Sequence, residues 1–189
     1  MPKKVLVLLA DGFEEVEAVT PIDYLRRAGL DVTSAAIGKD RLVAGSRGIS
    51  VTADTTLAEL AKTGRAGASA WDAVLLPGGG RGAANLAASP ETGALLKDMA
   101  VAGKWIAAIC ASPAVVLAPL GLLAGRRFTC FPGMEANVSG AKWTEDPVAA
   151  DGNIITSRGA GTAGRWAVEI IGRLLGPAEG EKVARSVLL

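Results

Sequence analysis

The chain has 189 residues, of which 20 are Lys or Arg, 19 are Asp or Glu, two are Cys and none is His. This length, with 50% hydrophobic and 21% charged residues, is typical of one soluble globular domain spanning residues 1–189. The absence of His excludes Ser-His-Asp triads, Cys-His dyads and His-based metal sites, and the net charge of +1 gives no footprint for nucleic acid or an anionic membrane. We expect neither a metal nor a cofactor.

The first apolar run, Val5 to Ala10, is followed by acidic residues. It is too short for a signal-peptide core or a membrane span, and it predicts a buried strand. We expect a cytoplasmic protein in which Cys110 and Cys130 are free thiols, because disulfides are rare in a reducing compartment.

Short apolar runs alternate with segments of helical periodicity along the chain, and such runs are typical of parallel strands covered on both faces. The predicted strands are Lys4–Ala10, Asp31–Ile37, Ile49–Ala53, Asp72–Leu76, Trp105–Ile109 and Arg127–Cys130. The predicted helices are Glu15–Ala28, a short one after Asp54, Pro90–Ala102, Ser112–Ala118, Ala163–Leu175 and Glu179–Val187.

Near the C-terminus, the Asp151-Gly152 turn between Val148–Ala150 and Asn153–Thr156 predicts a β-hairpin added to the sheet. The order of elements predicts a flavodoxin-like, doubly wound α/β sandwich with a mostly parallel sheet. Ligands of such sheets bind at the carboxyl ends of the strands, so the turns that follow strands are the places to seek chemistry.

One such turn carries Cys110, which ends an apolar strand just before a predicted helix. Small neighbours two residues away, Ala108 and Ser112, suit a nucleophile on a tight strand-to-helix turn. The positive end of the helix would favour the thiolate. A small buried core cysteine is the alternative interpretation.

An acidic turn follows the first strand, and its Glu14 and Glu15 suit the first turn of a helix. Glu17 has apolar neighbours, and burial at the sheet edge would raise its pKa. A neutral Glu17 could donate a hydrogen bond to a thiolate, whereas a solvated helix carboxylate is the alternative.

Two turns are rich in glycine. Gly78 and Gly79 could point backbone N–H groups at an oxyanion, and their spacing fits neither a dinucleotide site nor a P-loop. Arg158 and Gly159 precede the last long helix, where capping and substrate-lining roles both remain open.

The stretches ADGFEEVEAVTPIDYLRRAG, LPGGGRGAANL, IAAICASPAVVLA and ITSRGAGTA resemble the ThiJ/PfpI superfamily, in the branch of bacterial YajL and the human parkinsonism-associated deglycase. The resemblance runs from Lys4 to Leu189. It implies a flavodoxin-like homodimer in which Cys110 is an oxidisable nucleophile and Glu17 a protonated partner. It also implies an oxyanion hole formed by the N–H groups of Gly79 and Ala111.

The wider substrate pocket is expected to include Gly78, Arg47, Arg27, Cys130, Phe131, Arg158 and Gly159, with one arginine reaching across the dimer interface. In the human deglycase a histidine precedes the proline of the segment aligned with residues 128–132, and here Phe131 takes its place. The proton-transfer role of that histidine is therefore unfilled. The peptidase branch and the class I glutamine amidotransferases are excluded, because both need a histidine.

These residues allow two main functions. The first is a deglycase or glyoxalase that acts on 2-oxoaldehydes or their protein adducts and protects against oxidative stress. The second is a non-catalytic redox sensor or chaperone controlled by oxidation of Cys110. A scaffold without chemistry is the remaining alternative.

Overall fold

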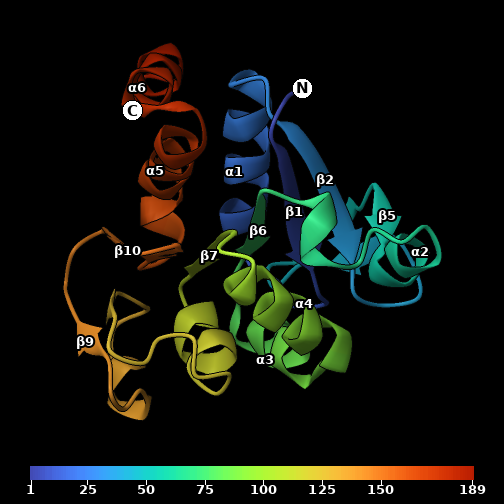
Figure 1. Cartoon of the computed structure of the whole chain (residues 1–189), viewed down its shortest axis with the longest axis horizontal. Coiled ribbons are helices and arrows are strands. Elements are labelled where there is room, and N and C mark those ends of the chain that lie inside the picture. Colours follow the sequence, from blue (N-terminus) through green and yellow to red (C-terminus); the bar gives the residue numbers. More distant parts are fainter.

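The computed structural model describes residues 1–189, which form a seven-stranded sheet in the order β10-β11-β7-β6-β1-β2-β5 (Figure 1). All neighbouring strands are parallel except β10, which is antiparallel to β11. The predicted α/β fold and the hairpin at Asp151-Gly152 are confirmed. The strands of this sheet are β1 (Lys4–Leu9), β2 (Asp31–Ala36), β5 (Thr55–Thr56), β6 (Ala73–Leu76), β7 (Trp105–Ile109), β10 (Val148–Asp151) and β11 (Ile154–Ser157).

Helices cover both faces of the sheet, because side chains alternate between the faces along each strand. Leu6 and Leu8 of β1 enter the core beneath α2, α3 and α4, whereas Val5 and Val7 enter the core beneath α1 and α5. Figure 1 shows α1, α5 and α6 gathered apart from α3 and α4. The helices are α1 (Glu15–Arg27), α2 (Leu57–Lys62), α3 (Gly80–Ala88), α4 (Pro90–Val101), α5 (Ala163–Leu175) and α6 (Pro177–Ser186), with short 3₁₀ turns at Ala68–Ala70, Glu135–Asn137 and Ala160–Thr162. None of them combines the length and apolar character that crossing a membrane requires.

Two predicted strands lie outside the central sheet. The segment Ile49–Ala53 contains β4 (Ser50–Thr52), which pairs with β3 (Leu42–Ala44) in a separate antiparallel hairpin. The segment Arg127–Cys130 contains only a two-residue strand, β8 (Arg127–Phe128), which pairs with β9 (Lys142–Trp143). The residue pattern indicated extended backbone correctly, but it does not encode which strand becomes the partner.

The helical predictions differ at two positions beside the sheet edge. The segment Ser112–Ala118 forms a single π-helical turn, η2 (Pro113–Leu117), in place of an α-helix. Helix α3 was not predicted, because Gly80 and Gly82 have low helix propensity. A Cβ atom at Gly82 would lie 2.6 Å from Phe13 Cα, so this glycine lets α3 pack directly on the turn after β1. That packing places the N-terminus of α3 at the carboxyl edge of the sheet.

Candidate functional site

Cys110 lies immediately after β7, on a turn whose backbone is strained. Its φ of 63° is in the left-handed region, which non-glycine residues rarely adopt, and such strain often marks functional sites. Its N–H donates to the carbonyl oxygen of Ser157 at 2.9 Å. The neighbouring Ser112 hydroxyl donates to the carbonyl oxygen of Pro77 at 2.6 Å. These bonds join the ends of β6, β7 and β11 around the half-buried cysteine.

Gly78, two residues after β6, has no room for a side chain. A Cβ atom there would lie 2.6 Å from Cys110 Cβ and 2.7 Å from Glu17 Oε2. The Gly78 N–H donates to that same Glu17 oxygen at 2.8 Å. The glycine thus lets the chain after β6 lie against both the cysteine and the carboxyl group and hold the latter in place.

Glu17 lies in α1 and is completely buried. Burial raises its pKa to about 7 against the opposing hydrogen bond from Gly78, and the charge of nearby Glu14 acts in the same direction as burial. Its second oxygen, Oε1, is buried without a hydrogen-bond partner. A buried oxygen without a partner is costly for a carboxylate, and this favours the protonated acid.

Opposing effects act on the Cys110 thiol. Burial and the negative charge of Glu17 raise its pKa to about 12, whereas hydrogen bonds from the N–H groups of Gly79 and Ala111 act to lower it. The stabilisation expected from the following helical turn is therefore present, but burial outweighs it as long as Glu17 is ionised and adds its negative charge.

Because Glu17 and Cys110 interact strongly, they titrate as a coupled pair, and the two pKa values describe the pair and not the separate residues. Between the values of about 7 and about 12, the pair holds one proton and one negative charge. Two N–H groups face the sulfur, whereas one faces the carboxyl group. A proton held on Glu17 removes the negative charge that opposes the thiolate, and with two N–H groups at the sulfur this arrangement favours a thiolate beside a neutral acid.

The cysteine and the glutamate face a cavity of about 450 Å³, a size typical of small-molecule sites. Of the predicted site residues, Cys110, Glu17, Gly79, Ala111, Arg47 and Phe131 line it. Five further lining residues were not predicted as site residues: Glu14, Ser46, Gly80, Met134 and Ala160. Ser46 and Ala160 are sequence neighbours of the predicted site residues Arg47 and Gly159. Nothing in the sequence around Met134 indicates that it lines a cavity.

Glu15 fixes the turn that brings Arg47 to the cavity. Its buried carboxylate accepts hydrogen bonds from the N–H groups of Arg47 at 2.6 Å and Ile49 at 3.3 Å, and from the Ser46 hydroxyl at 3.2 Å. Burial alone would raise the pKa of Glu15, but these bonds together lower it. Glu15 therefore does more than complement the helix dipole, which was its predicted role.

Five predicted pocket residues are not among those that line the cavity in the single chain: Arg27, Arg158, Cys130, Gly78 and Gly159. Arg27, at the end of α1, pairs with Asp23 at 2.8 Å, and the Arg158 guanidinium donates to the Glu145 carbonyl oxygen at 2.9 Å. Cys130 is buried in the core, where burial raises its pKa to about 11. The fourth, Gly78, is packed behind the pair formed by Glu17 and Cys110.

Gly159 also lies beside the cavity. A Cβ atom there would be 3.6 Å from the Phe131 ring and 3.9 Å from Glu17 Oε1, so this glycine keeps the space between them open. Both cysteines are free, as predicted.

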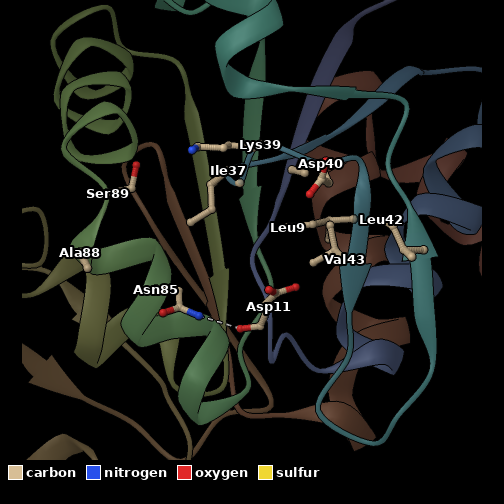
Figure 2. A pocket seen from close by; sticks show the side chains of 12 residues that line it. Leu9, Asp11, Ile37, Lys39, Asp40, Leu42, Val43, Asn85, Ala88 and Ser89 are labelled. Carbon is tan, nitrogen blue, oxygen red and sulfur yellow. Dashed lines mark hydrogen bonds between the residues drawn. The ribbon is translucent and has the colours of Figure 1, made fainter.

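A second hollow, of about 340 Å³, lies at the carboxyl ends of β1 and β2 (Figure 2). Asp11 and Asn85 lie across its floor, where the Asn85 amide donates to the Asp11 carbonyl oxygen at 2.8 Å. Its charged side chains, including Lys39 and Asp40, are exposed to solvent. It contains no nucleophilic cysteine and no buried carboxyl group, so the cavity at Cys110 is the candidate active site.

The sheet is flavodoxin-like, a strained cysteine lies at its carboxyl edge, and a buried acid lies beside that cysteine. These features define an α/β protein whose candidate nucleophile is a cysteine on the tight turn after a strand. Comparison with known proteins makes the assignment specific. The chain belongs to the DJ-1/PfpI family, whose model matches residues 3–173.

Relatives match over nearly the whole chain. The Parkinson disease protein 7 homolog of Danio rerio is 40% identical over 99% of this chain and 97% of its own length. Protein DJ-1 homolog B of Arabidopsis thaliana is 40% identical over 98% of this chain, which spans 41% of that longer protein. A protein named deglycase from Pyrococcus abyssi is 32% identical over 89% of this chain and 97% of its own length. The crystal structure of Drosophila melanogaster DJ-1beta, 39% identical, matches with a TM-score of 0.92 and covers 100% of this chain and 99% of that one.

The close approach at Gly78 generates a first prediction. We expect Gly78→Ala to lower the free energy of unfolding by about 1–3 kcal/mol, because the added methyl group overlaps Cys110 and Glu17. Urea denaturation measures the change. Gly80→Ala is the matched control, since a Cβ atom at Gly80 meets nothing within 4 Å. Equal stability of the two variants would contradict this account.

The shared proton generates a second prediction. Alkylation of Cys110 by iodoacetamide should rise with an apparent pKa near 7, because the pair loses a proton there and the remaining one can lie on Glu17. In Glu17→Gln the thiol must lose its own proton while buried, so the midpoint should move upward. Peptide mass spectrometry distinguishes Cys110 from Cys130. A wild-type midpoint far above 9, or no change in the variant, would place the proton on sulfur.

Proposed function

We propose that the protein is a cysteine-dependent glyoxalase or deglycase that acts on 2-oxoaldehydes or their protein adducts and protects against oxidative stress. The observation that carries the proposal is the completely buried Glu17, with an unpartnered oxygen, beside Cys110 in a cavity. Such a pair supplies both a nucleophile and a proton donor without histidine. The relative named deglycase supports the same reaction class.

The reaction begins with attack of the Cys110 thiolate on the aldehyde carbon. The carbonyl π electrons move to oxygen, where the N–H groups of Gly79 and Ala111 stabilise the alkoxide. Glu17 gives its proton to this oxygen and becomes a carboxylate, which then acts as the base. The carboxylate moves a proton from the attacked carbon to the neighbouring carbon, while the hydroxyl proton passes to the former ketone oxygen, and the adduct becomes a thioester of a 2-hydroxy acid. Water then hydrolyses the thioester: its hydroxyl group joins the acyl carbon to give the acid, the thiolate leaves, and the remaining proton of the water returns to Glu17.

We also propose that the protein is a cytoplasmic homodimer, and exposed apolar side chains on and beside α1 support the dimer. Val16 and Val19 are each 47% exposed on α1, and Ile49 is 61% exposed on the turn that Glu15 holds against this helix. This apolar surface is suited to a second copy of the chain, and the predicted role of Arg27 then belongs to the partner's cavity. No cofactor or metal enters the proposed reaction.

Lactate formation from methylglyoxal tests the enzymatic proposal. Cys110→Ser should reduce the rate by about a hundredfold or more, because the hydroxyl group is a far weaker nucleophile. Cys130→Ser should retain activity, since this buried thiol does not line the cavity. Indistinguishable rates for wild type and Cys110→Ser at matched concentration would exclude the mechanism.

A redox sensor or chaperone is the second candidate function, in which oxidation of Cys110 alters partner binding. The unpartnered Glu17 Oε1 and the N–H groups of Gly79 and Ala111 favour it, because they could hydrogen-bond oxygens added to the sulfur. Half-buried Cys110 remains reachable by peroxide, whereas Cys130 is buried.

Mild peroxide treatment followed by peptide mass spectrometry tests this alternative. We expect sulfinic acid on Cys110 and an unmodified Cys130, and Glu17→Ala should reduce the sulfinic fraction severalfold, because the neutral carboxyl group that stabilises the added oxygens is lost. Equal modification of both cysteines, or none at Cys110, would count against a sensing role.

A further inference from the structure

The cavity beside Cys110 has an aromatic side chain that the proposed reaction does not use. Phe131 is 50% exposed, whereas Phe13 and Phe128 are each 1% exposed. Its N–H donates to the Cys110 carbonyl oxygen at 2.9 Å, which fixes Phe131 beside the nucleophile. An aromatic ring that remains half exposed within a cavity offers apolar surface to a ligand.

The other groups around the ring make this part of the cavity apolar. Met134, Ala111 and Ala160 line the same cavity, and the open space at Gly159 lies against the ring. The charged lining residues, Glu14, Glu17 and Arg47, come from the N-cap and first turn of α1 and from the turn after β3. A ligand that reaches Cys110 therefore has an apolar surface available for the substituent on its carbonyl group.

We propose that Phe131 determines substrate specificity, by selecting 2-oxoaldehydes that carry an aryl substituent over those that carry a methyl group. This inference rests on the proposed thiol chemistry. The aldehyde carbon meets the Cys110 sulfur and its oxygen faces the N–H groups of Gly79 and Ala111. The aryl group then packs against the Phe131 ring and Met134. Aromatic contact and the additional buried apolar area both favour the aryl compound.

Initial rates with phenylglyoxal and methylglyoxal measure the preference as a ratio of kcat/KM values. Phe131→Ala should lower this ratio about tenfold, and Phe131→Tyr, which keeps the ring, should preserve it. Trp143→Ala is the matched control, because Trp143 is a partly exposed aromatic residue that does not line the cavity. A ratio that is unchanged in Phe131→Ala while both substrates turn over would overturn the proposal.

A binding measurement separates this inference from the proposed reaction. Acetophenone and acetone, which lack the aldehyde, should protect Cys110 from iodoacetamide to different extents, with acetophenone effective at about tenfold lower concentration. Phe131→Ala should abolish the difference. If neither aldehyde is converted but this difference in protection appears, the aryl-binding site at Phe131 is supported and the enzymatic proposal fails. If acetophenone protects no better than acetone, the aryl site is excluded.

Discussion

The placement of Cys110 beside Glu17 depends on the missing side chain at Gly78. Because Gly78 has no Cβ atom, the chain after β6 comes close enough to touch both Cys110 and Glu17, and its N–H group binds the carboxyl oxygen. Glu17 is thereby held from two directions, by α1 through the covalent chain and by β6 through this bond. A sheet edge and a helix that are 61 residues apart in sequence thus share one buried acid.

That buried acid replaces part of what a histidine would supply. A histidine can exchange a proton near neutral pH without help from its surroundings. In this chain the same range is reached by a carboxyl group, because burial raises the pKa of Glu17 to about 7. The position after Cys130 is then free to carry an apolar ring, and Phe131 contributes surface instead of a proton. The proposed site therefore has one proton carrier and one apolar contact.

The order of strands and helices, the hairpin at Asp151-Gly152 and the placement of Cys110 were predictable, because each depends on a local pattern. Apolar runs mark buried strands, and small neighbours mark a tight turn. The juxtaposition of Glu17 with Cys110 was predicted as a possibility, and family resemblance made it specific. Met134 and the hydrogen bonds of Glu15 were missed, since they depend on how distant segments fold back against the sheet. The separate pairing of β3 with β4 and the helix at Gly80 were missed for the same reason, because close packing overrode local propensity.

The left-handed backbone at Cys110 has a consequence for how this protein tolerates change. A residue with a Cβ atom in that conformation is less stable than glycine by about 1–2 kcal/mol, so selection for stability alone would favour glycine at position 110. The backbone is therefore strained at the residue on which the proposed chemistry depends. A chain of this fold that did not need the thiol could relieve this strain by placing glycine at position 110.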